Sequence, residues 1–224
     1  MNYKFLLVTI ALLVPIKVKA DSHKFEGVAS CASSNCHGNS KPVSNSAVSR
    51  NEFTTWLRHD RHSKAYQTLL NERSKIIAKN LGISNPESDK KCLTCHATFL
   101  NSSQLKGEKF RTEDGVGCES CHGASELWIT SHIEDGAKYS ANIANGMTDL
   151  KNISVKSKLC ISCHLGDEDR KITHEIYGAG HPRLSFELDT YESVMPRHWA
   201  LSKDHDPVRE WLIGLAVQTK IRIL

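Results

Sequence analysis

The stretch Gly115-Val116-Gly117-Cys118-Glu119-Ser120-Cys121-His122-Gly123 contains the pattern on which the interpretation of this chain depends. Two cysteines are separated by two residues, and a histidine follows the second cysteine directly. The same unit recurs at Cys92–His96 and Cys160–His164, and a wider unit, with four residues between its cysteines, occupies Cys31–His37. All eight cysteines of the chain belong to these four pairs.

This arrangement is typical of c-type haem attachment. Each thiol adds to one vinyl group of the porphyrin, and the imidazole that follows binds the iron from one side. The pattern therefore predicts four covalently attached c-type haems, each held by two cysteines and one proximal histidine. The predicted attachment cysteines are Cys31, Cys36, Cys92, Cys95, Cys118, Cys121, Cys160 and Cys163, and the predicted proximal iron ligands are His37, His96, His122 and His164.

Paired cysteines have two other common uses. Cys92, Cys95, Cys118 and Cys121 have suitable spacing for a four-thiolate zinc site, and an exported chain can form disulfides instead. Neither use requires a histidine directly after every pair, so haem attachment is the favoured interpretation. The first motif is less typical, because two additional residues must bulge outward between Cys31 and Cys36; a disulfide or free thiols are its alternatives.

Residues 1–20 have the pattern of a secretory signal peptide. Lys4 precedes the short apolar run Phe5–Val14, and Val18-Lys19-Ala20 is suitable for cleavage before Asp21. The alternative is an uncleaved N-terminal anchor, for which the apolar run is short. Periplasmic localisation agrees with haem attachment, since bacteria attach c-type haem outside the cytoplasm.

Charge and composition narrow the function further. The formal net charge of +4 falls to +1 when the three lysines of residues 1–20 are removed, and haem propionates would make the holoprotein mildly acidic. Basic residues are scattered, so the chain is not expected to bind nucleic acid. Apolar residues make up 39% and aromatic residues 7%, which is modest for a conventional core. We therefore expect a haem-centred core, mainly α-helical with much irregular chain.

Periodicity predicts where the helices lie. Apolar residues recur at helical spacing over Glu52–Leu81, with Gly82 as the C-cap, and a second helix is expected from Ala124 to about His132. We expect three units: a signal peptide over 1–20, a tetrahaem domain over 21–190, and a helical C-terminal tail over 191–224. This tail is apolar on most sides and could dock on its own core or on a partner, but its charged residues exclude a membrane-spanning helix.

The second axial ligands must come from elsewhere in the chain. Met147 and Met195 are the only methionines after the predicted signal peptide, so histidine is expected to be the general second ligand. Local context favours His62, beside aromatic residues; His132, ten residues after a proximal histidine; and His174 and His181, which flank a Gly-rich turn. The other histidines are interpreted as surface or structural, with His23 undecided: His23, His59, His198 and His205.

Gly115–Gly123 closely resembles the third haem site of the cytochrome c-554 group of periplasmic tetrahaem cytochromes. Trp56, Asp60, His62 and Tyr66, together with Ala65, are similar to the helix that follows the first haem in that family, with His62 as its distal histidine. His132 matches the histidine that follows the third site. The resemblance extends over roughly residues 25–190 and implies a mostly helical fold with stacked and near-perpendicular haem pairs. The wide first motif and the segment from His174 to Leu188 depart from the family pattern.

These observations predict an electron carrier with bis-histidine haems. Its expected partners are redox proteins, either other cytochromes or a membrane quinol-linked donor, and the chain itself is not expected to be an integral membrane protein. A homo- or hetero-oligomer is left open. One alternative is a multihaem oxidoreductase that acts on a small nitrogen or sulfur compound at a five-coordinate haem, and another is a subunit of a larger multihaem complex.

Overall fold

The computed structural model describes residues 23–44, 46 and 48–223, so the predicted signal peptide lies outside the described residues. Within the described part the chain is mainly helical with long irregular connections, which confirms the predicted fold class. Its one β-type pairing there is an isolated bridge between Phe25 and Lys106. The elements are η1 Val28–Ser30, α1 Glu52–His59, η2 Arg61–Lys64, α2 Ala65–Thr68, α3 Glu72–Asn80, α4 Lys90–His96, η3 Ser103–Leu105, η4 Thr112–Asp114, α5 Cys118–His122, η5 Ser131–Ile133, α6 Tyr139–Ala144, α7 Ile153–His164, α8 His174–Gly178, α9 Leu188–Val194 and α10 Pro207–Ile223.

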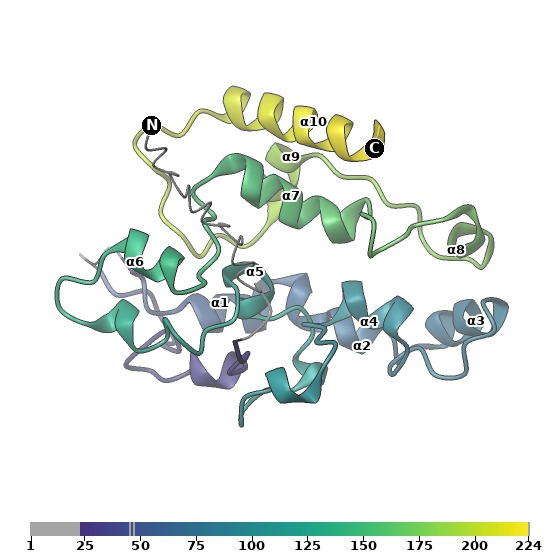
Figure 1. Ribbon diagram of the computed structural model, residues 1–224, viewed down its shortest axis with the longest axis horizontal. Helices are drawn as coiled ribbons and strands as arrows, with labels where there is room; N and C mark the ends of the chain where they lie inside the picture. Colours follow the sequence, from purple (N-terminus) through teal and green to yellow (C-terminus); the bar gives the residue numbers. More distant parts are fainter. Residues whose placement is uncertain (1–22, 45, 47, 224) are drawn as a thin grey trace, which may run out of the picture.

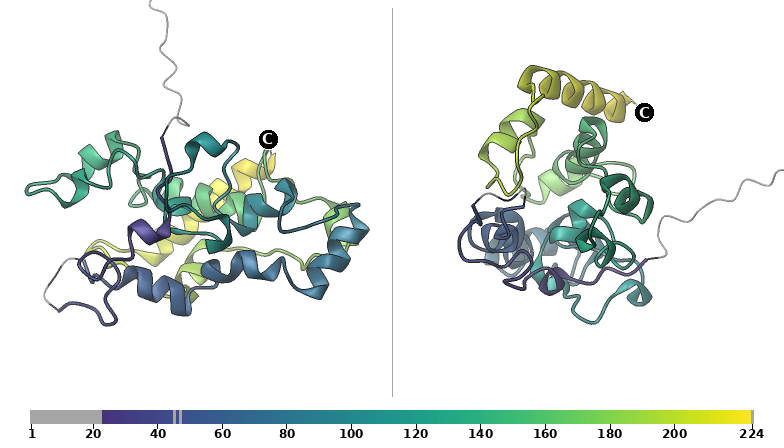
Figure 2. Two further views of the ribbon diagram at one scale, coloured as in Figure 1. Left: turned by 90° about the horizontal axis from the view of Figure 1, so that it is seen from below. Right: turned by 90° about the vertical axis from the view of Figure 1, so that its left-hand side faces the viewer.

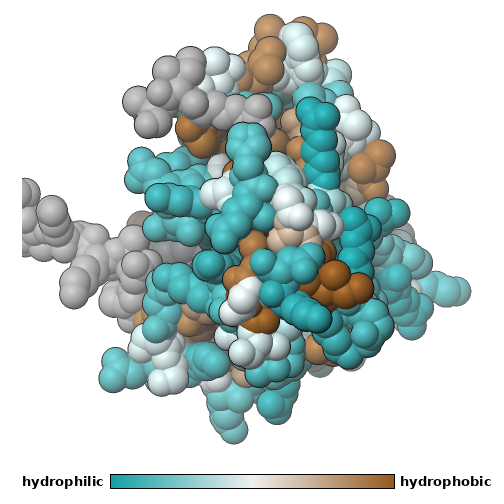
Figure 3. All heavy atoms as spheres, turned by 90° about the vertical axis from the view of Figure 1, so that its right-hand side faces the viewer, coloured by the Kyte–Doolittle hydropathy of each residue, from teal (hydrophilic) through white to brown (hydrophobic). Residues whose placement is uncertain are grey.

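The helices form two layers (Figure 1). Helices α1 to α4 lie along one side of the molecule, α7 and α10 run along the other, and α5 lies between them. The side view in Figure 2 shows the same separation of the N-terminal helices from α7 and α10. Helices α3 and α8 form one end of the molecule, where hydrophilic side chains surround separate apolar patches (Figure 3).

The continuous helix predicted over residues 52–81 is wrong, because the chain breaks twice. Asp60 has an extended backbone (ψ 127°), and its carboxylate accepts a hydrogen bond from the His62 amide at 2.9 Å, which begins η2. Asn71 then caps α3 by accepting from the Ser74 amide at 2.8 Å. Short polar side chains that satisfy free amides favour helix starts over helix interiors. The C-cap of α3 is Leu81, one residue before the predicted Gly82, and Gly82 follows it in the left-handed conformation that ends the helix, with a φ of +68°.

The segment predicted as a helix from Ala124 to about His132 forms separate turns instead. The Ile129 amide donates to the Ser125 carbonyl at 2.8 Å, and the His132 amide donates to Trp128 at 3.0 Å, but only the short η5 follows. Ser125 is held by a buried carboxylate at the start of this segment, so its amide and hydroxyl are already used outside it.

The C-terminal helix α10 packs against α7 and α9. Gly214 lies so close to α9 that a Cβ on it would come within 2.9 Å of Leu188 Cβ. Lys156 on α7 forms ion pairs with Glu192 of α9 at 2.7 Å and with Glu210 of α10 at 3.2 Å. Apolar contact and this shared lysine together hold the tail against the preceding helices.

The apolar interior is divided into two small clusters. One contains Leu69, Leu93 and Ala97 from the layer of α2 and α4, and the other contains Ile161, Phe186, Leu188 and neighbouring residues around α7, α9 and α10. Neither cluster extends across the space between the layers. The division agrees with the expectation that the polypeptide has little core of its own.

A buried carboxylate connects α5 to the N-terminal segment. Glu119 is 4% exposed. It accepts hydrogen bonds from the Glu26 amide at 2.8 Å, the Gly27 amide at 2.7 Å, and the Ser125 amide and hydroxyl at 2.9 and 2.6 Å. The distant N-terminal segment and the chain just after α5 are thereby held around the helix that carries Cys118 and Cys121.

Removal of this carboxylate is expected to destabilise the protein strongly. Glu119→Ala leaves several buried donors without an acceptor and should lower the free energy of unfolding by about 3 kcal/mol, whereas Glu119→Gln retains one oxygen and should cost about 1 kcal/mol. Denaturant unfolding of the holoprotein, followed by far-ultraviolet circular dichroism, measures both. Glu126→Gln is the matched control, because Glu126 accepts a single exposed bond from Lys24, and its effect should stay within about 0.5 kcal/mol. Equal losses of unfolding free energy in Glu119→Gln and Glu126→Gln would contradict the assignment of Glu119 as the buried acceptor.

The contact between α9 and α10 is expected to depend on pH. Burial and the neighbouring Glu210 raise the pKa of Glu192 to about 7, so folding favours its protonated form. A raised carboxyl pKa stabilises the fold at low pH, and this stabilisation is lost as pH rises through the folded pKa. The wild type should therefore lose more stability than Glu192→Gln between pH 5 and pH 8 in urea unfolding. Parallel profiles for the two proteins would show that Glu192 does not titrate in this range.

Candidate functional site

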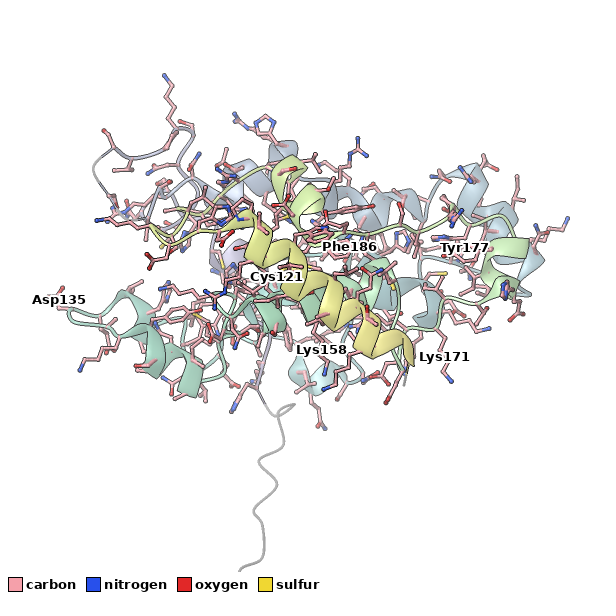
Figure 4. The ribbon with its side chains drawn as sticks, turned by 90° about the horizontal axis from the view of Figure 1, so that it is seen from above. Cys121, Asp135, Lys158, Lys171, Tyr177 and Phe186 are labelled. Carbon is pink, nitrogen blue, oxygen red and sulfur yellow. The ribbon has the colours of Figure 1, made fainter. Side chains whose placement is uncertain are left out.

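One large cavity lies between the two layers of helices. Its volume is about 2370 Å³, against the roughly 300–1,000 Å³ of a pocket for one small ligand. Figure 4 shows Cys121 and Phe186 near the middle of the molecule, whereas Asp135 is at the tip of an outer loop. All the predicted attachment cysteines and proximal histidines line the cavity: Cys31, Cys36, His37, Cys92, Cys95, His96, Cys118, Cys121, His122, Cys160, Cys163 and His164. The space and its lining fit several large flat ligands.

The three closely spaced motifs each form the end of an α-helix. Cys92–His96 ends α4, Cys118–His122 makes up α5, and Cys160–His164 ends α7. Residues three apart on a helix are neighbours on one face, so both thiols of a motif point to the same side. The histidine comes at the last residue of each helix, where the chain leaves in an irregular conformation.

The wide motif adopts a turn rather than a helix. The Cys36 amide donates to the Ser33 carbonyl at 2.9 Å, and the His37 amide donates back to the Cys31 carbonyl at 3.2 Å. Residues five apart on a helix would face different directions, so a turn is needed to bring both thiols to one cavity. This local geometry lets the two additional residues bulge while Cys31, Cys36 and His37 all line the cavity.

Cysteines of different motifs approach one another. Cys31 and Cys118 are neighbours, and their interaction lowers the pKa of Cys31 and raises that of Cys118. Cys95 and Cys163 are likewise neighbours, and the interaction lowers the pKa of Cys163 to about 6. The first motif thus adjoins the third, and the second adjoins the fourth.

Two alternatives for the cysteines, disulfides and a zinc site, find no counterpart in the described residues. All eight cysteines are free of disulfide bonds there. No group of three or more His, Cys, Asp or Glu side chains in the described ranges is arranged to hold a metal ion, so Cys92, Cys95, Cys118 and Cys121 do not form a four-thiolate cluster.

Six of the predicted ligand histidines form pairs across the cavity. The ring centres are separated as follows: His37 and His132 by 6.2 Å, His62 and His164 by 6.0 Å, and His96 and His181 by 6.4 Å. An iron with a nitrogen at about 2.0 Å on each side places the centres of two axial imidazoles about 6.3 Å apart. Each pair joins one proximal histidine to one distal candidate, so the spacing fits axial coordination of an iron between them.

Hydrogen bonds orient the distal rings. His132 Nδ1 donates to the Trp128 carbonyl at 3.1 Å, and His181 Nδ1 donates to Pro182 at 2.8 Å. His62 Nδ1 donates to the Asp60 carboxylate at 2.9 Å, and this bond raises the pKa of His62 although burial opposes the shift. A ring held through Nδ1 presents Nε2 as the available ligand atom.

The stretch Gly115–Gly117 positions His62. The Val116 amide donates to the His62 carbonyl at 3.1 Å, and the Trp56 indole donates to the Val116 carbonyl at 3.0 Å. Gly115 has a φ of +77°, and a Cβ there would lie 2.8 Å from the His62 carbonyl oxygen. This close approach requires glycine.

Some of the remaining histidines line the cavity and others do not. His174 is exposed at the start of α8 and does not line the cavity, so it is not brought together with the other predicted ligands. His23 is also outside the lining. His59, His198 and His205 line the cavity, although the sequence context of all three predicts surface or structural positions. The adjacent Trp199 is the signal that could have indicated His198 from the sequence.

In comparison with known proteins, one family model matches part of the chain. The family model for cytochrome c554 and c-prime matches residues 30–123, which contain the first three motifs but less than half of the chain. No curated protein and no solved structure matches the chain. The match supports a cytochrome c family for this chain, and that family implies covalently bound c-type haem.

Proposed function

We propose that this chain is a periplasmic tetrahaem c-type cytochrome that carries electrons between redox partners through bis-histidine haems. The observation that supports it best is the set of three histidine pairs, with ring centres 6.0 to 6.4 Å apart, in a cavity lined by all eight cysteines. Bound haem supplies an iron that gains and loses single electrons.

The residues of the chain determine what that iron can do. Two imidazoles on one iron fill both axial positions and leave none for a substrate, which favours electron transfer over catalysis. The cysteines would hold the porphyrins covalently, and the proximity of Cys31 to Cys118 and of Cys95 to Cys163 brings different motifs together. Electrons would therefore have short paths between the first and third haems and between the second and fourth.

Carboxylates are positioned to tune two of the irons. Glu52 lies 2.9 Å from His37 Nδ1, and Asp60 lies 2.9 Å from His62 Nδ1. The rings of His96, His132 and His181 instead have backbone carbonyls as Nδ1 partners. A carboxylate makes its imidazole more basic and stabilises the oxidised iron. The haems ligated by His37 and His62 would have the lower potentials.

The proposed location and partners follow the family. Cytochromes of this family are typically extracytoplasmic, and residues 1–20 are the proposed signal peptide. In the described ranges, none of the helices is both long enough and apolar enough to span a bilayer. We assign residues 21–190 as the tetrahaem domain and 191–224 as a tail docked on it. Redox proteins, such as other cytochromes or a quinol-linked donor, are the proposed partners.

One observation favours a second function. His122 is the proximal histidine for which no ring pair is found among the described residues, which is the arrangement of a five-coordinate haem. An open position there would suit a multihaem oxidoreductase acting on a small nitrogen or sulfur compound. A spectrum of the oxidised protein that changes on addition of nitrite or hydroxylamine would favour this enzyme over the carrier.

The number of haems tests the main proposal. The intact mass should exceed that of residues 21–224 by four haem masses, because every motif directs its thiols into the cavity. Replacing Cys31 and Cys36 by serine should remove one haem, and replacing Cys92 and Cys95 by serine, the matched control in a closely spaced motif, should also remove one. If the first variant carries as many haems as the wild type, the wide motif holds no haem.

The carboxylate beside His62 provides a test of potential tuning. Asp60→Asn retains a hydrogen-bond acceptor but removes the charge, so one haem potential should rise in a redox titration while the haem stays low-spin. Glu72→Gln, an exposed change on α3, should leave all potentials unchanged. If the Asp60 variant titrates like the wild type, the carboxylate does not tune the iron.

A further inference from the structure

The fourth proximal histidine lacks an identified partner. His122 ends α5 and lines the cavity, as the other three proximal histidines do. The rings of His37, His96 and His164 each face a distal histidine, whereas the described residues contain no such ring pair for His122. His174, the remaining ligand predicted from the sequence, is exposed on α8 and outside the cavity.

The connection between α9 and α10 brings another histidine to this place. Figures 1 and 2 show this connection descending from the upper layer toward α5. Much of it lines the cavity, including Met195, His198 and Trp199. His198 is half-buried and lines the same cavity as His122. The connection therefore brings the imidazole of His198 to the cavity that His122 lines at the end of α5.

The surroundings of His198 repeat those of His132. His198 Nδ1 lies 3.3 Å from the Pro196 carbonyl, and Trp199 packs on the ring edge at 5.1 Å and 88°. His132 Nδ1 lies 3.1 Å from the Trp128 carbonyl, and Trp128 packs on its ring at 5.5 Å and 80°. In both cases a local carbonyl and an indole orient the imidazole and leave Nε2 available to a metal.

The other histidines are less suitable. His205 lines the cavity and is paired through Nδ1 with Glu210 at 3.3 Å, but this carboxylate also binds Lys156, so His205 is tied to α10 and α7 rather than to α5. His59 is exposed at the end of α1, and His23 lies outside the cavity lining near Glu126.

We propose that His198 is the distal axial ligand of the haem held by Cys118 and Cys121, opposite His122. This inference rests on the proposed function, since it assumes a haem at the third motif. It makes all four irons six-coordinate and removes the open position that an enzyme of this type would need.

Electron paramagnetic resonance and optical spectra of the oxidised holoprotein test the assignment. The wild type should show only low-spin haem, and His198→Gly should convert one haem to the high-spin state. Added imidazole should then return that haem to the low-spin state, because the ligand would occupy the space left by the side chain. His174→Gly and His205→Gly are the matched controls and should remain entirely low-spin.

Other outcomes overturn the assignment. A His198→Gly protein that keeps four low-spin haems excludes His198, as does a high-spin signal produced by His174→Gly. A high-spin haem already present in the wild type also excludes His198 as the ligand. So does an absorption band of methionine ligation that disappears when Met195 is replaced. Intact mass distinguishes failure of the proposed function from failure of the His198 assignment. Fewer than four haems in the wild type contradicts the proposed function. Four haems together with unchanged spectra of the His198→Gly protein contradict only the role of His198.

Discussion

Convergence of eight thiols on one cavity is the constraint to which the rest of the structure conforms. Protein interiors are normally close-packed, yet here two small apolar clusters leave a space of about 2370 Å³ between them. Covalently bound haem, as proposed, would supply the large apolar surface that the chain lacks, and the cofactor would complete the core. The short helices and long connections follow from this, because each segment needs only to bring its motif to the cavity wall.

The polypeptide contributes a polar framework around that space. Glu119 sits between two attachment cysteines and collects amides from the N-terminal segment and from Ser125. Gly115 and Val116 adjoin it and hold the backbone of His62. Hydrogen bonds to a buried carboxylate and a close backbone contact are directional, so they determine relative position more sharply than apolar contact does. One stretch thereby aligns its own haem motif with a histidine from a different part of the chain.

Sequence context favoured four histidines as distal ligands, and the structure brings three of them opposite proximal histidines. Aromatic neighbours predict His62, the distance from a proximal histidine predicts His132, and a Gly-rich turn predicts His181; all three lie opposite proximal histidines. His174 has similar neighbours, but α8 turns it outward. His198 has proline and charged neighbours typical of a surface loop, yet the docking of α10 carries its segment along the cavity. The helix predicted over residues 52–81 was broken by Asp60 and Asn71, whose capping ability a periodicity argument ignores.

The sequence by itself determined the helical class and predicted the haem-attachment chemistry, because two thiols and an imidazole at short spacing act as a local unit whatever surrounds them. It also indicated that the chain needs a cofactor to fill its interior. Only the tertiary structure decided which histidine faces which motif, since the partners lie far apart along the chain and meet through the docking of whole segments. The packing of α10 on α7 and α9 and the hydrogen bonds of Glu119 determine the paths of these segments. Neither can be derived from the residues next to a histidine.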